Sequence, residues 1–168
     1  ANDLNTMRSI VEVGNMYAGF EFQTTVFAFK HAGVLGDVVF KKYRIINKGN
    51  NTVDSMYFGY WSDPDLGDAN DDFIGCDTIL NLGYAYNDSI DGDGLGNTYG
   101  ITPPAVGYKL VQGPLTSGTS IDSSKFNGVW LTGYNNLSMN SFVFFNNSPS
   151  PFPPPITFSA YEWYNYIQ

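Results

Sequence analysis

Aspartates are the residues of this chain whose number and spacing could do chemistry. Nine of the sixteen acidic residues lie between Trp61 and Tyr99, a stretch without Lys or Arg. They form two runs, one ending at Asp77 and one beginning at Asp88. Carboxylates this close repel one another unless a cation neutralises them, and oxygen ligands beside glycine turns suit Ca²⁺ before Mg²⁺. The sequence therefore predicts a calcium site, and its candidate ligands are Asp63, Asp65, Asp68, Asp72, Asp77, Asp91 and Asp93.

Neither acidic run is an EF-hand loop. Asp68, Asn70 and Asp72 have the spacing of the first ligands of that loop. However, Phe73 stands where the loop needs glycine, and Ile79 stands where it needs a bidentate glutamate. The second run also lacks a closing acid. Two alternatives stay open: a composite site built from both loops, and a solvated acidic face on which aspartates cap turns.

Catalysis is not expected. The chain has three glutamates that no pattern pairs, and crowded loop aspartates differ from the separated acid and base of a glycosidase. The only histidine, His31, lies in a glycine-containing turn that it is expected to cap. Motifs of serine hydrolases, zinc proteases and phosphate-binding loops are absent. We therefore predict that the chain is not an enzyme.

Charge and hydropathy exclude two classes of partner. The formal net charge is −8, and the few Lys and Arg are scattered, which argues against nucleic-acid binding. The sequence has neither a polybasic segment nor an apolar run near the ~20 residues of a membrane span, so no membrane insertion is expected. The lone Cys76 is expected to be a small hydrophobe rather than a reactive thiol, because its surroundings are negative.

The fold is predicted to be all-β, an antiparallel β-sandwich with long Gly/Asp-rich loops. Aromatic residues make up 17% of the chain and charged residues only 14%, a composition typical of strands and turns. Alternation predicts a strand from Tyr17 to Phe29 and a hairpin that pairs Asp37–Asn47 with Thr52–Trp61 across Lys48–Asn51. Further strands are predicted at Thr78–Tyr86, Ala105–Gln112, Gly128–Leu131, Ser141–Phe145 and Ile156–Tyr166. Residues 1–168 fit a single domain.

The ends of the chain suggest association. The proline-rich segment Asn146–Pro155 is predicted to be a polyproline connector. After it, Tyr161–Gln168 is an aromatic strand that ends abruptly, so we expect the chain to be part of a longer polypeptide. This strand, or the segment Asp3–Val13, is expected to pair with a neighbouring copy or another protein, as in donor-strand pairing.

One long motif resembles a known module. Residues Tyr43 to Asp77, which include Asp63-Pro-Asp-Leu-Gly-Asp-Ala-Asn-Asp-Asp-Phe-Ile-Gly-Cys-Asp77, resemble an immunoglobulin-like module of large uncharacterised secreted proteins from bacteria with type IX secretion. Leu82–Asn87 and Pro103–Pro114 extend the resemblance. It implies an extracellular or cell-surface location and a β-sandwich, but no assigned activity.

Together these features predict a non-catalytic extracellular structural or adhesive surface module that is stabilised by calcium and able to assemble into a filament. Its expected partners are other copies of itself, other surface proteins, and glycans. The alternative is a carbohydrate-binding accessory domain of a secreted hydrolase, in which some of the three Trp and twelve Tyr stack on sugars. Exposed coplanar aromatics on one sheet face would favour that alternative.

Overall fold

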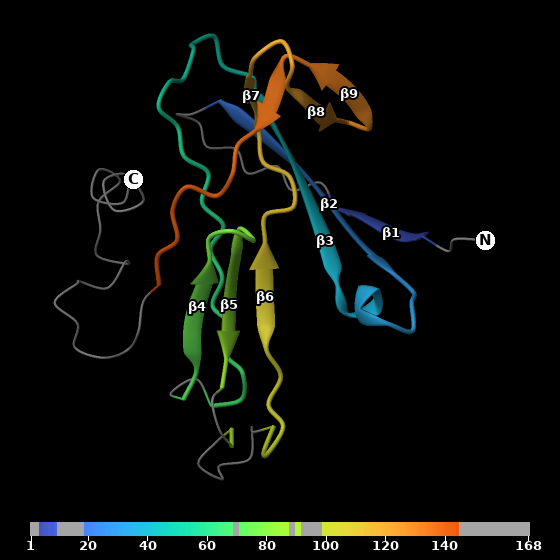
Figure 1. The fold of residues 1–168 in the computed structure, drawn as a ribbon, viewed down its shortest axis with the longest axis vertical. Helices are drawn as coiled ribbons and strands as arrows, with labels where there is room; N and C mark the ends of the chain where they lie inside the picture. Colours follow the sequence, from blue (N-terminus) through green and yellow to red (C-terminus); the bar gives the residue numbers. More distant parts are fainter. Residues whose placement is uncertain (1–3, 10–18, 69–70, 88–89, 92–98, 145–168) are drawn as a thin grey trace, which may run out of the picture. The chain divides into compact units, whose positions relative to one another are not determined.

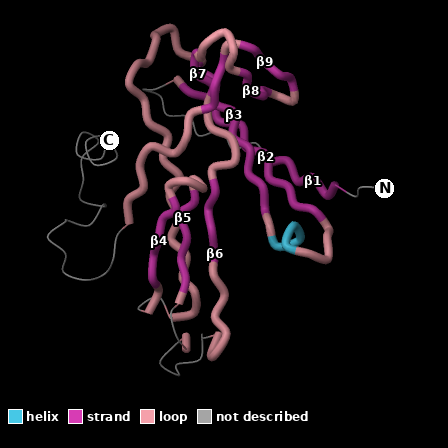
Figure 2. Tube along the Cα trace, viewed as in Figure 1, coloured by secondary structure: helices cyan, strands magenta, loops and turns pink. Residues whose placement is uncertain are grey.

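The computed structural model describes residues 4–9, 19–68, 71–87, 90–91 and 99–144. It confirms the predicted fold class: the chain is all-β, and its sheets are antiparallel (Figure 1). Within the described ranges the only helical element is a single 3₁₀ turn, η1 at Val34–Asp37 (Figure 2). The strands are β1 (Leu4–Ser9), β2 (Phe20–Phe29), β3 (Val39–Asn47), β4 (Phe73–Asp77), β5 (Leu82–Tyr86), β6 (Val106–Lys109), β7 (Leu115–Ser117), β8 (Ser123–Phe126), β9 (Val129–Thr132) and β10 (Tyr134–Asn136).

The chain divides into two compact units, Ala1–Met56 and Tyr57–Gln168. Each unit is described below by itself. That the whole chain acts as one domain stays a prediction.

The first unit is a three-stranded sheet with the order β1-β2-β3. Its central strand is β2, where the predicted alternation runs over ten residues. Strand β2 pairs with β3 from Phe20 opposite Asn47 to Ala28 opposite Val39. On this ladder the rings of Phe27 and Phe40 stack at a centroid distance of 5.0 Å, as cross-strand aromatic pairs do.

The predicted hairpin after β3 is wrong. Residues 52–61 form no strand, and β3 pairs with β2 instead. The turn lies where it was expected, because the Asn47 side chain accepts a hydrogen bond from the Gly49 amide and donates one to the Asn51 carbonyl. However, the Lys48 and Gly49 amides both donate to the Gly19 carbonyl, so the turn extends the β2–β3 ladder. Alternation identifies a strand but not its partner, and the longer strand β2 is that partner.

The other predicted strands have mixed outcomes. Strands β5 and β6 lie within the predicted segments but are shorter, β9 is shifted by one residue from its predicted segment, and residues 141–144 form no strand. Residues 145–168, and with them the proline-rich segment and both C-terminal strand predictions, lie outside the described residues. The N-terminal strand β1 pairs with β2 of the same chain along one edge, and pairing of the N-terminal segment with a neighbouring copy or another protein stays a prediction.

The second unit contains the sheet β4-β5-β6 and the two-stranded pairs β7–β10 and β8–β9. One face of β4-β5-β6 is covered: the Phe142 ring lies over Gly83, where an added Cβ would be 2.4 Å from that ring, and Tyr60 packs against Tyr108. Ala85 on this face is buried. Successive side chains of a strand point to opposite faces of the sheet, so Phe73 lies on the face opposite to Ala85. Strand β4 itself was not predicted, because it lies inside the first acidic run.

Candidate functional site

Asp91 joins the two acidic runs. Its side chain is only 1% exposed. Its Oδ1 accepts a hydrogen bond of 3.0 Å from the Asp68 amide, and its Oδ2 accepts one from the Tyr99 amide. Its own amide donates to the Gly100 carbonyl at 2.9 Å. A buried carboxylate is tolerated when donors satisfy its oxygens, so Asp91 holds the loop before β4 to the segment around Tyr99 and Gly100.

Gly67 makes the close approach of these loops possible. Its φ is +85°, and a Cβ added there would lie 2.0 Å from Asp91 Oδ2. A residue with a side chain would therefore meet both backbone strain and a clash with the buried carboxylate. The run Leu66-Gly67-Asp68 wraps around Asp91 because its middle residue has no side chain.

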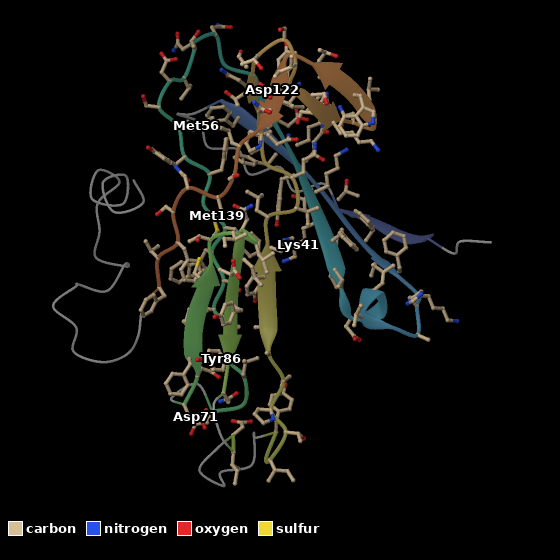
Figure 3. All side chains as sticks on the ribbon, viewed as in Figure 1. Lys41, Met56, Asp71, Tyr86, Asp122 and Met139 are labelled. Carbon is tan, nitrogen blue, oxygen red and sulfur yellow. The ribbon has the colours of Figure 1, made fainter. Side chains whose placement is uncertain are left out.

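Among the residues that the structure describes, two buried oxygens beside this clamp have no hydrogen-bond partner: Asp72 Oδ1 and Asn87 Oδ1. The other oxygen of Asp72 accepts a 3.0 Å hydrogen bond from the Leu66 amide. The Asn87 amide nitrogen donates to Asp71 Oδ1 at 2.6 Å. Because Phe73 and Tyr86 are cross-strand partners, Asp72 and Asn87 occupy the next position of the β4–β5 register. Figure 3 labels Asp71 and Tyr86 at this end of the sheet.

The other predicted ligands lie apart or outside the described residues. Asp63 and Asp65 are exposed in the segment before Leu66. Asp77 is the last residue of β4, about 16 Å along the strand from Asp72, so the two cannot share an ion. Its Oδ1 instead accepts a hydrogen bond from the Leu80 amide, the turn-capping role left open by the sequence. Asp93 lies outside the described residues.

The aspartates of the described ranges do not by themselves form a metal centre. Within these ranges no three carboxylate, imidazole or thiol groups come close enough to hold one ion. Asp91 already uses both oxygens on backbone amides. The aspartate pattern of the sequence does not predict Asn87, because its side chain is an uncharged amide. Its place immediately before the second acidic run was the signal that could have identified it.

A row of aromatic side chains lies on the other face of the same sheet, opposite to the face that Phe142 and Tyr60 cover. Phe73 and Tyr86 are cross-strand partners with ring centroids 5.8 Å apart and planes inclined by 34°. Tyr84 continues the row at 5.8 Å from Tyr86, with an inclination of 39°. Phe73 is 46% exposed and Tyr86 37%. We call Phe73, Tyr86 and Tyr84 the aromatic row.

The isolated reactive residues have structural roles. His31 Nδ1 accepts a 3.0 Å hydrogen bond from the Gly33 amide, which confirms that this histidine caps its turn. Cys76 is half-buried and unpaired on β4, opposite Gly83. Within the described part of the chain, neither residue lies beside a partner that would make it a nucleophile or a base.

Comparison with known proteins adds no family. No family model matches the chain, and no curated protein or solved structure does either. Across the residues that the structure describes, none of the helical segments is long and apolar enough to cross a membrane.

Proposed function

We propose that the chain is a non-catalytic extracellular structural or adhesive module whose acidic loops bind Ca²⁺. The observation that carries this proposal is the pair of buried oxygens Asp72 Oδ1 and Asn87 Oδ1 at neighbouring strand ends, for which the described part of the chain offers no hydrogen-bond donor. Buried acceptors without a donor are costly, so a bound group is expected to satisfy them.

A cation suits these oxygens better than a donor from the protein. The stretch from Trp61 to Tyr99 contains nine acidic residues and no Lys or Arg, so its own charge is uncompensated. Ca²⁺ accepts carboxylate, amide and backbone carbonyl oxygens in flexible geometry. The Asp72 carboxylate and the Asn87 amide would be ligands of the ion, and further oxygens of these loops would complete its shell.

The role proposed for the ion is structural. Bound calcium would reduce repulsion among the aspartates and stabilise the loops that Asp91 already holds together. Extracellular modules bind Ca²⁺ with dissociation constants of about 10⁻⁴ to 10⁻³ M, which is sufficient where calcium is millimolar. The proposed extracellular location and the proposed metal therefore support each other.

Thermal unfolding with and without calcium tests the proposal. Raising free Ca²⁺ from a chelated solution to 10 mM should raise Tm by about 3–10 °C, because 10–100 times Kd stabilises the native state by about 1.4–2.7 kcal/mol. Mg²⁺ at the same ionic strength controls for screening of the net negative charge, and it should produce a smaller shift.

Two variants localise the effect. Asp72→Asn should abolish most of the calcium-dependent shift, because it removes the charge of the proposed ligand. Asp63→Asn removes the same charge from an exposed position and should leave the shift intact. Equal shifts with Ca²⁺ and Mg²⁺, or an unchanged shift in Asp72→Asn, would leave only a solvated acidic face.

A further inference from the structure

We infer that the aromatic row is a binding surface for a neutral saccharide chain. The inference gives the proposed adhesive function a ligand class, but it does not depend on calcium. The two proposals can therefore fail separately.

The row is built flat by the residues around it. Tyr84 has glycines opposite it on both neighbouring strands, Gly75 on β4 and Gly107 on β6. A Cβ added at Gly75 would lie 2.4 Å from Tyr84 Cζ, so the ring lies across that strand and covers the glycine. The ring therefore lies along the sheet instead of standing away from it, and its face is turned outward.

The spacing of the rings makes a continuous platform. Successive centroids are 5.8 Å apart from Phe73 to Tyr86 and from Tyr86 to Tyr84, and successive planes differ by less than 40°. Phe73 and Tyr86 lie opposite each other across β4 and β5, and Tyr84 lies two residues from Tyr86 along β5, so the three rings form one connected aromatic patch. Neighbouring flat rings of an oligosaccharide are a ligand shape that such a patch accommodates.

The surroundings of the row favour sugar over an apolar partner. Beyond its Tyr84 end, the same face carries Leu82 between Asp77 and Lys109. The apolar surface is thus bordered there by groups that donate or accept hydrogen bonds. A pyranose has an apolar C–H face and a rim of hydroxyls, so both parts of it meet matching groups.

Charge selects among saccharides. The aspartates before β4 adjoin the Phe73 end of the row, and the whole chain carries a net charge of −8. An acidic polysaccharide would be repelled by this surface. A neutral saccharide chain is not repelled by this surface, and it is therefore the inferred ligand class.

Titration of the full chain with soluble six-residue oligomers of β-linked glucose, mannose and xylose tests the inference, with a six-residue oligogalacturonate as the acidic comparison. At least one neutral oligomer should bind, and the acidic one should bind at least tenfold more weakly. Phe73→Ala and Tyr86→Ala should each weaken binding by about tenfold or more, by analogy with the loss of one aromatic ring that stacks on a flat ligand. Gly75→Ala should also weaken binding, because its Cβ displaces the Tyr84 ring.

Matched controls separate the row from exposed aromatics elsewhere. Phe126 is 48% exposed and Tyr134 41%, and both lie outside the row. Phe126→Ala and Tyr134→Ala should leave the dissociation constant within about twofold of the wild type, and circular dichroism should show that every variant is folded. The titrations are repeated with chelator, so that a calcium effect on Tm and a saccharide effect on the row are read separately.

Three results would overturn the inference. The first is that none of the three neutral oligomers binds at millimolar concentration. The second is that a neutral oligomer binds equally well to Tyr86→Ala, Phe73→Ala and the wild type. The third is that the acidic oligomer binds as tightly as the neutral ones, which would show that the aspartates do not select the ligand.

Discussion

The sheets β1-β2-β3 and β4-β5-β6 are both three-stranded and antiparallel, but their side chains are buried to different degrees. Between residues 19 and 56 no residue is buried, and the sheet of the first unit relies on its long ladder and on partly exposed aromatic pairs. The buried residues of the described ranges, Leu66, Gly83, Ala85, Asp91 and Ser124, all belong to the second unit. The first unit is therefore stabilised along the whole of its hydrogen-bonded ladder. The second unit is stabilised mainly by a few buried residues, one of which is Asp91.

Asp91→Ala should have the largest effect on stability. It tests whether the second unit depends on a few buried residues. The substitution leaves the Asp68 and Tyr99 amides without an acceptor in a buried position, and each unsatisfied donor costs about 1–3 kcal/mol. We expect a loss of about 3 kcal/mol or more in the free energy of unfolding, measured by urea denaturation. Amide hydrogen exchange should accelerate around residues 66–91 and stay unchanged in β2 and β3.

The control for Asp91 is Asp65→Ala. Asp65 is exposed, so its removal should change the free energy of unfolding by less than about 0.5 kcal/mol. If Asp91→Ala also left the free energy of unfolding unchanged, the buried carboxylate would not contribute to stability. The proposed difference between the two sheets would then be wrong.

Gly67→Ala should have the next largest effect. Gly67 and Gly128 have almost the same positive φ, +85° and +86°, but an added Cβ meets Asp91 Oδ2 at 2.0 Å in the first case and nothing within 4 Å in the second. We therefore expect Gly128→Ala to cost about 1 kcal/mol through backbone strain alone, and Gly67→Ala to cost at least 1 kcal/mol more. Thermal or urea unfolding measures both variants. Equal costs would mean that the loops adjust without disturbing Asp91.

Phe27→Ala measures the contribution of one aromatic pair in the first unit. Phe27 stacks on Phe40 in a sheet without buried residues, so we expect a loss of only about 1–2 kcal/mol. Val39→Ala, at a 60% exposed position of the same sheet, should change stability by less than about 0.5 kcal/mol. A cost for Phe27→Ala as large as that of Asp91→Ala would mean that the first unit has a point of concentrated stability too.

The smallest effects concern two partly exposed carboxylates, Glu21 and Asp122, and their pH dependence. A hydrogen bond from Lys48, whose Nζ lies 3.0 Å from Glu21 Oε2, lowers the pKa of Glu21, and a hydrogen bond from Gln23 lowers it further. In the second unit, the Thr119 amide and hydroxyl lower the pKa of Asp122. Because the folded pKa lies below the unfolded one, each contribution to stability is present above the unfolded pKa and is lost as pH falls through the folded pKa.

Glu21→Gln and Asp122→Asn test these two contributions separately. Each variant should approach the stability of the wild type below pH 4 and be slightly less stable at neutral pH, as measured by urea unfolding across pH 2–7. Direct titration of the two carboxyl groups by NMR should show values below 4.5 for Glu21 and below 3.8 for Asp122. Values at or above these references would show that the hydrogen bonds do not persist in solution.

The amino-acid sequence alone determined the all-β class and the positions of two long strands. Period-two alternation identified β2 and β3 as strands, because the direction of a side chain in a strand depends only on local backbone geometry. Aromatic and turn-forming residues predicted an all-β chain for the same local reason. The concentration of aspartates between Trp61 and Tyr99 also pointed to the region in which Asp91 is buried, while the metal site predicted there stays a prediction.

Tertiary structure alone decided the rest. Alternation could not show that β3 pairs with β2 rather than with residues 52–61, because pairing depends on contacts between distant segments. The sequence pattern also could not distinguish Asp91, which accepts hydrogen bonds from two amides, from Asp77, which caps a turn at the far end of β4. The role of a carboxylate depends on the donors that the fold brings to it. Likewise, Phe73 and Tyr86 became an exposed row only when segments from the other parts of the second unit covered the opposite face of their sheet.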